Sequence, residues 1–119
     1  MDLGTRQHVN NARYLSYLED ARIAYWRQLG LSRELGVIIA DIHITYLVQI
    51  FLDDQIKVGV RVTRIANKSM TFQHEIVGLS GAPVYAAVEV VMVAYDYETD
   101  AAVPVPEEWR RLIAEFEGL

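Results

Sequence analysis

The feature that most constrains this chain is a change of hydrophobic period near residue 36. From residue 11 to residue 29, apolar side chains recur at intervals of three and four, which predicts one face of an α-helix of about five turns. Asn10 or Asn11 can cap its start, and Gly30 stands where a helix C-terminus favours glycine. The apolar positions of the expected helix are Tyr14, Leu18, Ala21, Tyr25 and Leu29.

After Gly36 the period becomes two, which predicts strands. The expected strands cover residues 37–47, 55–65, a third segment containing Met70 to Ile76, and 84–97. In the first strand, one face is expected to carry Ile38, Ala40, Ile42, Ile44 and Tyr46. A short helical turn is expected over residues 32–35, and a closing helix over residues 107–116 with acids at its start, where the helix dipole favours them.

The connections between these strands are short enough for hairpins, so we expect an antiparallel sheet. The long helix is the element able to cover one apolar face of it. The expected fold class is therefore α+β, with one domain over residues 1–119, because 52% of the 119 residues are hydrophobic and 23% are charged. A domain of this size without disulfides gains stability from self-association, so we expect an oligomer.

Composition also excludes several functions. The chain has no cysteine, which rules out thiol nucleophiles and cysteine-bound zinc and agrees with a reducing compartment. The formal net charge is -5 and the 11 Lys and Arg residues are scattered, which argues against nucleic-acid binding. No apolar run has the length of a membrane span, and the first residues have no signal-peptide pattern. We expect a cytoplasmic protein with no membrane contact.

A polar cluster precedes the long helix: residues 2–14 read DLGTRQHVNNARY. The first backbone N–H groups of a helix lack intrahelical acceptors and carry partial positive charge, so they can stabilise a carbonyl oxygen that gains negative charge during attack. His8 or a nearby carboxylate can orient or deprotonate water there. These residue types permit acyl transfer to water without requiring it. The alternative is ordinary capping by asparagine, which contributes about 1 kcal/mol by itself.

Other titratable residues have simpler interpretations. His43 and His74 each lie on an expected strand without a second ligand at metal-binding spacing, so no metal site is predicted. Glu19 is a second candidate base if it faces the apolar side of the helix. The alternative is a surface ion pair between Glu19 and Arg22, three residues on, contributing at most about 0.5 kcal/mol. Motifs for a phosphate-binding loop, a serine nucleophile elbow and an HExxH zinc site are absent from the sequence.

The stretch HVNNARYLSYLEDAR, from His8 to Arg22, resembles hot-dog-fold thioesterases of the 4-hydroxybenzoyl-CoA thioesterase type. QHVNN is also similar to plant-type acyl-carrier-protein thioesterases. The similarity extends to Tyr46-Leu47 with residues 50–54, to Lys68-Ser69 with Phe72, and to residues 96–107. It implies a long helix wrapped by a curved antiparallel sheet with a short C-terminal helix. It also implies homodimers or homotetramers with acyl-CoA sites between subunits.

The resemblance assigns roles to particular residues. The thioester carbonyl would lie against backbone N–H groups near His8, Asn10 and Asn11, with the acyl group along the helix past Tyr14. Lys68 and Ser69 match positions that can contact the phosphates of CoA. The resemblance implies no metal or redox cofactor, since CoA is part of the substrate.

Two departures from the family pattern affect these expectations. Gly4 stands where many members carry the catalytic aspartate, and Asp2 lies two residues away, about 7 Å in an extended segment. Plant-type enzymes carry an asparagine where this chain has Arg6. The family also has a strand ahead of the acidic motif, whereas Met1 lies directly before it. Either the protein begins upstream, or the sheet lacks that strand and exposes an edge that another subunit covers.

The expected function is therefore hydrolysis of an acyl-CoA or acyl-carrier-protein thioester. His8 acts in this expectation with Asp2 or Glu19 as the carboxylate. The alternative is a non-catalytic protein that binds the same ligand, which Gly4 favours. A hot-dog hydratase is less attractive, because no Asp and His pair has the spacing of that branch.

Overall fold

The computed structural model describes residues 9–31 and 36–119. The expected short turn over residues 32–35 lies outside the described residues. The long helix and the strands agree with the predicted segments to within a residue or two, and a two-residue strand, which the sequence did not predict, follows the last long strand. The elements in chain order are α1 (Asn11–Leu29), β1 (Gly36–Tyr46), β2 (Ile56–Ile65), β3 (Ser69–Gly78), β4 (Val84–Asp96), β5 (Ala101–Ala102) and α2 (Glu107–Glu117).

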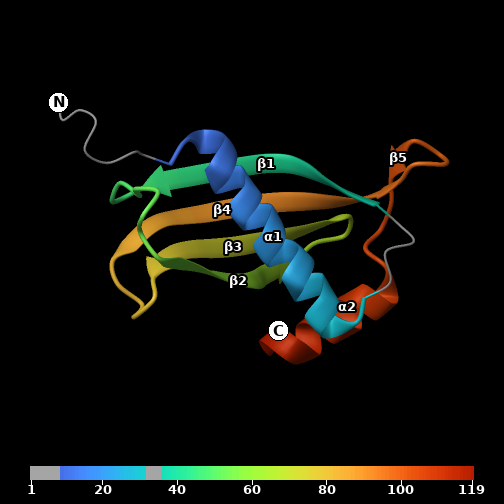
Figure 1. Cartoon of the computed structure of the whole chain (residues 1–119). Helices are drawn as coiled ribbons and strands as arrows, with labels where there is room; N and C mark the ends of the chain where they lie inside the picture. The colour runs from blue at the N-terminus through green and yellow to red at the C-terminus, as the bar shows by residue number, and fades with distance from the viewer. Residues whose placement is uncertain (1–8, 32–35) are drawn as a thin grey trace.

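The strands form one curved antiparallel sheet in the order β1-β4-β3-β2, with β5 beside the end of β4 (Figure 1). The connections from β2 to β3 and from β3 to β4 are hairpins, as predicted. The prediction of a hairpin between β1 and β2 is wrong, because β1 pairs with β4 and β2 lies at the opposite edge of the sheet. The chain between β1 and β2 instead passes the start of α1, where the Val9 N–H donates to the Ile50 carbonyl over 2.9 Å.

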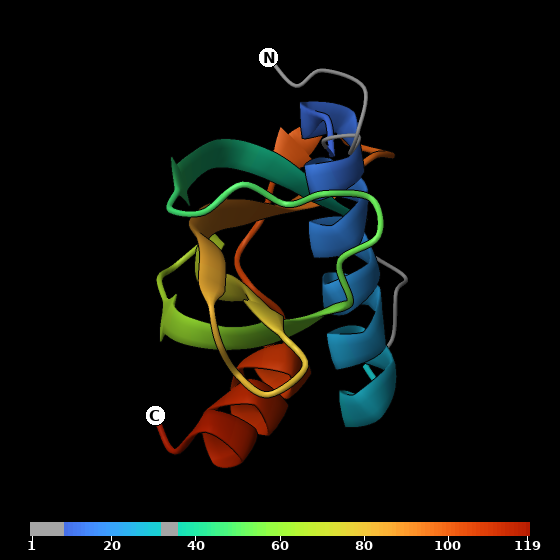
Figure 2. The ribbon, with the colours of Figure 1, turned by 60° about the vertical axis from the view of Figure 1, so that its left-hand side comes forward.

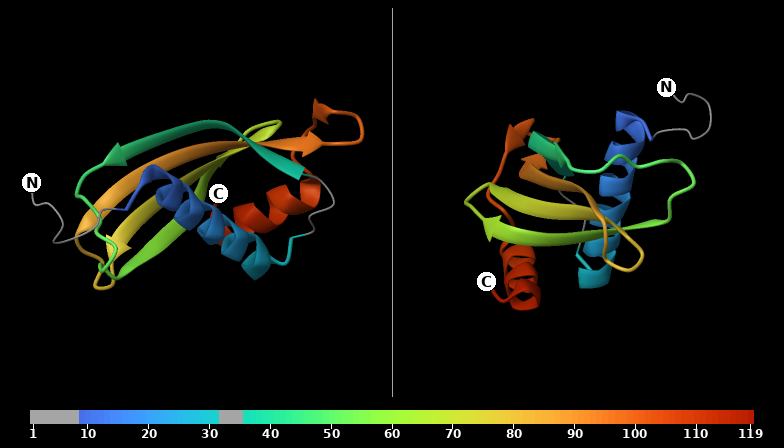
Figure 3. Two further views of the ribbon diagram at one scale, coloured as in Figure 1. Left: turned by 45° about the horizontal axis from the view of Figure 1, so that its top comes forward. Right: turned by 90° about the vertical axis from the view of Figure 1, so that its left-hand side faces the viewer.

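The long helix lies across one face of the sheet, as predicted (Figure 2). Its course is diagonal, from the side of β1 at its start toward β2 and α2 at its end (Figures 1 and 3). Gly30 ends it in the left-handed conformation, with φ of 66°, as the sequence predicted. No helix in residues 9–31 and 36–119 is long and apolar enough to cross a membrane.

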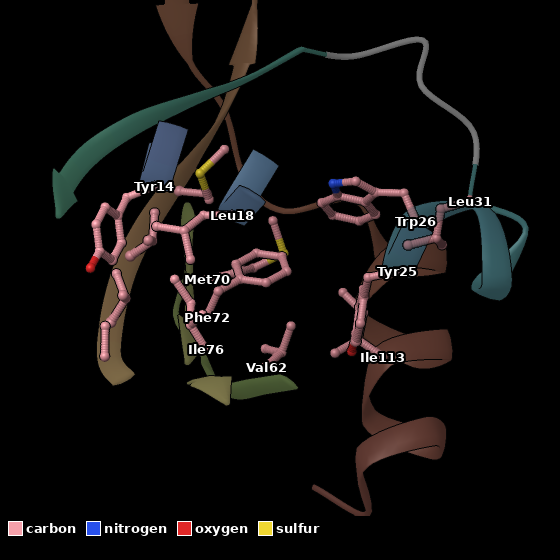
Figure 4. Close-up of a cluster of buried hydrophobic side chains, with 14 of the residues drawn as sticks. Tyr14, Leu18, Tyr25, Trp26, Leu31, Val62, Met70, Phe72, Ile76 and Ile113 are labelled. Carbon is pink, nitrogen blue, oxygen red and sulfur yellow. The ribbon is translucent and has the colours of Figure 1, made fainter. Parts of the chain in front are cut away.

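The core lies between α1 and the inner face of the sheet (Figure 4). From Ser69 to Ile76 every second residue of β3 is buried, in agreement with the predicted alternation, and the last two residues of the strand are buried as well. Of the five apolar positions expected on α1, Tyr14, Leu18 and Tyr25 are buried, as is Trp26, and the other two are half-buried. The buried side chains of β3 on this face are Met70, Phe72, His74 and Ile76.

The second helix closes the end of the molecule to which the C-terminal half of α1 points. Trp109 and Ile113 are its buried residues, and the ring centroids of Trp109 and Trp26 are 5.2 Å apart. In the last turn, Glu117 Oε2 accepts hydrogen bonds from the Tyr25 hydroxyl over 2.7 Å and from the Val62 N–H over 2.8 Å. One carboxylate therefore ties α2 to both α1 and β2.

A β-bulge in β1 changes which side chains face α1. Ile39 pairs with Met92 and Asp41 with Val91, so Ala40 is an extra residue without a partner on β4. Residues 42, 44 and 46 share the inner face as predicted, but the prediction was wrong for Ile38 and Ala40. Across the bulge the inner face passes to Ile39, whose partner Met92 is a core residue.

Candidate functional site

The start of α1 is capped by an uncharged side chain, and no acidic residue of the first turn interacts with the positive end of the helix dipole. Asn10 is the N-cap residue, and its side-chain oxygen accepts a hydrogen bond from the Arg13 N–H over 3.0 Å. The ordinary capping interpretation is thus confirmed for the Asn10 side chain. The first turn contains no acidic residue, so no carboxylate of that turn offsets the positive end of the helix dipole.

The segment after β1 is fixed beside this terminus by backbone hydrogen bonds. The N–H groups of Leu47 and Val48 both donate to the Tyr85 carbonyl, over 2.8 and 3.0 Å. Ile50 then accepts from the Val9 N–H, and its side chain is buried. The segment between Leu47 and Ile50 is therefore held at both ends, by β4 and by the residue before the N-cap.

Tyr14 joins the helix to this segment. Only 4% of the side chain is exposed, and its ring meets the Tyr46 ring edge-on with centroids 5.1 Å apart. Burial, followed by the neighbouring Tyr46, raises the pKa of Tyr14 above its ordinary value, while a hydrogen bond from the backbone of Ile50 opposes the shift. The Tyr14 phenol is therefore protonated at neutral pH.

An open pocket of about 310 Å³ lies between the helix start and this segment. Its lining combines aliphatic side chains with two tyrosine rings and an amide side chain, and more of its surface is polar than apolar. A pocket beside a helix N-terminus can hold an acyl thioester with its carbonyl oxygen against the helix. The lining residues are Val9, Tyr14, Tyr46, Leu47, Val48 and Gln49.

The candidate residues of the sequence fall into separate groups. Asp2 and His8 lie outside the described residues, and so does the side chain of Asn11, the first residue of α1. Asn10 lies at the helix start and Tyr14 lines the pocket beside it. Within residues 9–31, these two are the predicted substrate-binding side chains that the structure brings to one place.

Glu19 is exposed and lies farther along the helix. Eight residues separate it from Asn11, which is about 12 Å of helix rise. Its side chain lines two adjoining pockets between α1 and β1, and not the pocket at the helix start. A role for Glu19 as a base at the helix terminus stays a prediction, and within one chain the two sites are a few helical turns apart.

Lys68 and Ser69 are at the other end of the sheet. Ser69 pairs with Val93 on β4, whereas Tyr46, which lines the helix-start pocket, pairs with Ala86. Seven residues of β4 separate these partners, about 23 Å along the strand. Within one chain, Lys68 and Ser69 therefore do not reach the helix-start pocket, and their contact with CoA stays a prediction.

The structure brings together two residues that the sequence placed apart. Arg22 is 7% exposed and His74 is fully buried, and Arg22 Nη1 lies 3.4 Å from His74 Nε2. The expectation of a surface ion pair between Arg22 and Glu19 was wrong, because Arg22 lies four residues after Leu18 and four before Trp26, on the buried face of α1. No Arg22 nitrogen lies within ion-pair distance of a carboxylate of the described residues.

The chemistry of this pair follows from the donor inventory. A guanidinium has only donors, so His74 Nε2 accepts and the imidazole proton is on Nδ1. His74 Nδ1 has no hydrogen-bond partner in the described part of the chain. Burial, followed by the charge of Arg22, lowers the pKa of His74 to about 4, and His74 is neutral at pH 7. Burial also lowers the pKa of Arg22, an effect that Glu19 opposes.

Sequence reasoning missed two parts of the site. It did not identify Leu47, Val48 and Gln49 as pocket residues, because their packing on the helix start depends on a long-range connection. It also missed the burial of Arg22, although its spacing from Leu18 and Trp26 was a usable signal. Among residues 9–31 and 36–119, no group of three or more His, Asp or Glu side chains could hold a metal ion.

Comparisons with known proteins extend this description. Residues 2–113 match the Thioesterase-like superfamily. Long-chain acyl-CoA thioesterase FadM of Escherichia coli (strain K12) is 27% identical over 122 residues, which covers 96% of this chain and 90% of FadM. The uncharacterized protein YsmA of Bacillus subtilis (strain 168) is 26% identical over 104 residues, which covers 85% of this chain and 70% of YsmA.

Solved structures have the same architecture. A thioesterase of Thermus thermophilus, crystallised with coenzyme A and Zn, superposes with a TM-score of 0.82 at 33% identity, over 95% of this chain and 84% of that chain. Protein SAV2348 of Staphylococcus aureus, in complex with CoA, has a TM-score of 0.84 at 20% identity, over 98% of this chain and 77% of that chain, a likeness of fold alone. Since the family match spans nearly the whole sequence, the chain belongs to the Thioesterase-like superfamily and has its hot-dog fold.

Proposed function

We infer that the protein is an acyl-CoA thioesterase that binds the thioester carbonyl at the start of α1. The observation that carries this proposal is the open pocket beside that helix terminus, in a chain of a thioesterase family. The similarity to FadM and to a thioesterase crystallised with coenzyme A supports CoA as the leaving group. An acyl-carrier-protein thioester offers the same bond to the same pocket and belongs in the substrate panel.

In the proposed reaction, water adds to the thioester carbonyl carbon. The carbonyl oxygen becomes negative and is stabilised by backbone N–H groups of the first turn of α1, whose charge no acid of that turn offsets. The carbon–sulfur bond then breaks, and CoA leaves as a thiol with the proton taken from water. We assign the transfer of that proton to His8, with Asp2 or Glu19 as the carboxylate that orients or deprotonates the water.

A second function is favoured by one residue of the sequence. Gly4 occupies the position of the family's usual catalytic aspartate. Loss of one general base typically reduces a rate by about 10²- to 10⁴-fold. A protein that binds acyl-CoA without hydrolysing it is therefore the alternative to be separated from the enzyme.

The two functions differ in release of free CoA. The purified protein is incubated with acyl-CoAs and one acyl-carrier-protein thioester, and a thiol reagent measures released thiol. We expect release of free thiol. We expect His8→Ala to reduce kcat strongly. Of Asp2→Asn and Glu19→Gln, the variant that removes the carboxylate used in the reaction is expected to reduce kcat as well. Asp20→Asn and His43→Ala are matched controls, since both side chains are exposed and line neither the helix-start pocket nor the α1–β1 pockets.

Binding of acyl-CoA measured by calorimetry, without thiol release and without response to these substitutions, would establish the binding protein instead. A reduction of kcat by the control substitutions as large as that of His8→Ala would also count against the assigned roles. Equal oligomer size and melting temperature across the variants make these comparisons valid.

A further inference from the structure

A groove runs along the side of α1 that faces β1. It consists of the two adjoining pockets, of about 250 and 180 Å³, that share Glu19, Arg22 and Ile39. Its remaining lining is almost entirely apolar, and two of the β1 side chains in it are strongly exposed: Ile39 by 48% and Ile42 by 36%. We call it the α1–β1 groove. The diagonal course of α1 leaves this part of the sheet uncovered (Figures 1 and 3).

The α1–β1 groove lies farther along α1 than the helix-start pocket and shares no lining residue with it. That pocket ends at Tyr14 on the helix and Tyr46 on the strand, whose rings pack against each other. The groove begins at Leu15, the next residue of α1, and at Leu18, one turn after Tyr14. On β1 the same direction leads from Tyr46 to Ile42 and Ile39. A chain attached at the helix start that runs along α1 past the Tyr14–Tyr46 ring pair would enter this groove between the same two elements.

Arg22 lies part-way along the α1–β1 groove. Eleven residues separate it from Asn11, which is about 16 Å of helix rise, a distance of the order of an extended dodecanoyl chain. The side chain lines both pockets of the groove although only 7% of the residue is exposed. A guanidinium has five N–H donors, and the one hydrogen bond of Arg22 within the described segments goes to His74. Donors therefore remain for a ligand in the groove.

A buried cation that lacks a close anion lowers the stability of the folded protein. The presence of Arg22 in a largely apolar groove therefore indicates a functional reason. The neutral imidazole of His74 holds the guanidinium from below without neutralising it. Glu19 lines the same two pockets from the exposed side and places a negative charge near the same point. The pair Arg22 and Glu19 is neutral in sum, and a carboxylate ligand would be repelled by Glu19.

We propose that Arg22 is a specificity-determining residue that selects acyl groups carrying a neutral oxygen function, a hydroxyl or an oxo group, far from the thioester. The oxygen accepts a hydrogen bond from Arg22; a hydroxyl also donates to Glu19 in the arrangement in which Asp2 is the carboxylate of the reaction. His74 is a positioning residue that fixes the guanidinium. This proposal rests on the proposed function in one respect, the position of the thioester at the start of α1.

The test compares acyl-CoAs of one length. Hydrolysis of dodecanoyl-CoA, ω-hydroxydodecanoyl-CoA and ω-carboxydodecanoyl-CoA is followed with a thiol reagent. Because a hydrogen bond to a buried charged group is at stake, we expect KM for the hydroxylated substrate to be about tenfold lower or more than for dodecanoyl-CoA, with similar kcat. Arg22→Met, which keeps an unbranched apolar stem, is expected to abolish this difference, and Arg22→Lys to retain part of it.

Equal KM values for the three substrates in the wild type, or a hydroxyl preference that survives Arg22→Met, would overturn the proposal. A preference for the carboxylated substrate that depends on Arg22 would overturn the claim that the selected oxygen function is neutral. Melting curves show whether the variants fold; Arg22→Met removes a buried charge and is expected to keep or raise the melting temperature.

A second pair of variants tests the path of the chain without touching a charge. Ile39 lines the groove, whereas its neighbour Ile38 lies on the opposite face of β1 with similar exposure. Ile39→Trp is expected to raise KM for dodecanoyl-CoA far more than for butanoyl-CoA, because it narrows the groove beyond the thioester. Ile38→Trp is the matched control and is expected to change neither value; equal effects of the two substitutions would contradict the path.

A binding measurement separates this proposal from the thioesterase activity. Trp26 lines the groove, so its fluorescence can report the non-hydrolysable thioethers S-dodecyl-CoA and S-(ω-hydroxydodecyl)-CoA. Tighter binding of the hydroxylated thioether that is lost in Arg22→Met, with no hydrolysis of any thioester, would sustain the role of Arg22 and reject the enzyme. Hydrolysis of the thioesters without any preference that depends on Arg22 would instead support the enzyme and reject the role of Arg22.

Discussion

The two flanks of α1 differ in how they are closed. Toward β2 and α2, aromatic rings pack edge to face: Tyr25 and Trp26 both contact Phe72, with centroids 5.7 and 5.8 Å away. Toward β1, Ile39, Ile42 and Tyr46 at the end of the strand are exposed, and the first two line the α1–β1 groove. One flank of the same helix is thus closed by aromatic packing, and the other carries the open α1–β1 groove.

The largest effect should come from the packed flank. Phe72 is fully buried, so Phe72→Ala is expected to lower the free energy of unfolding by about 3–5 kcal/mol, because it removes apolar contact and leaves a cavity. Ile39→Ala on the open flank should cost less than about 1 kcal/mol. Urea unfolding of the two variants measures this difference, and similar costs would break the comparison.

The boundary between the flanks should respond to pH. His74 has a pKa of about 4 in the folded protein and about 6.5 when unfolded. The unfolded state therefore binds the proton first, and the free energy of unfolding falls as pH drops from 6.5 to 4, by about 3 kcal/mol in total. Denaturant unfolding as a function of pH should show this slope. His74→Phe should remove it, and a slope unchanged in that variant would place its origin elsewhere.

The hydrogen bonds that close the packed flank should have a smaller effect. Tyr25→Phe removes the donor to Glu117 while the Val62 N–H still donates to the same oxygen. We expect a loss of about 1.5 kcal/mol, typical of one hydrogen bond to a charged acceptor. Tyr17→Phe, on a half-buried side chain of the same helix, is the control for removal of a hydroxyl. Thermal melts in which Tyr17→Phe loses as much stability as Tyr25→Phe would argue against a stabilising hydrogen bond from Tyr25 to Glu117.

The smallest effect on stability is expected at the helix start. Asn10→Ala removes the side-chain acceptor of the Arg13 N–H and should cost about 1 kcal/mol, whereas Asn10→Ser or Asn10→Asp should cost less. Asn10→Asp also adds negative charge at the proposed carbonyl site, so we expect it to keep stability and lower activity. Urea unfolding and thiol release on the same three proteins check this, and unchanged activity in Asn10→Asp would weaken the helix-start site.

The fold could be predicted from the sequence to the extent that its signals are local. The period of α1, the glycine at its end and the alternation in β3 are properties of neighbouring residues, and all are confirmed. The position of β1 beside β4 and the bulge at Ala40 depend on partners distant in the sequence, so local patterns did not predict them.

The candidate site shows the same limit. Tyr14 follows from helical spacing, and it lines the pocket. The segment from Leu47 to Gln49 reaches the helix only because Ile50 binds the residue before the N-cap. Arg22 was expected in a surface ion pair with Glu19, three residues before it, yet its position on the helix places it against His74.

The bulge in β1 has a consequence for changes in chain length. A one-residue deletion inside a strand ordinarily turns every following side chain to the other face. Ala40 is the unpaired residue of the bulge, so its deletion would restore a regular ladder and leave Ile39 and Ile42 on the face they now occupy. Shortening β1 at this point would change the curvature of the strand while the two residues that line the groove keep their orientation.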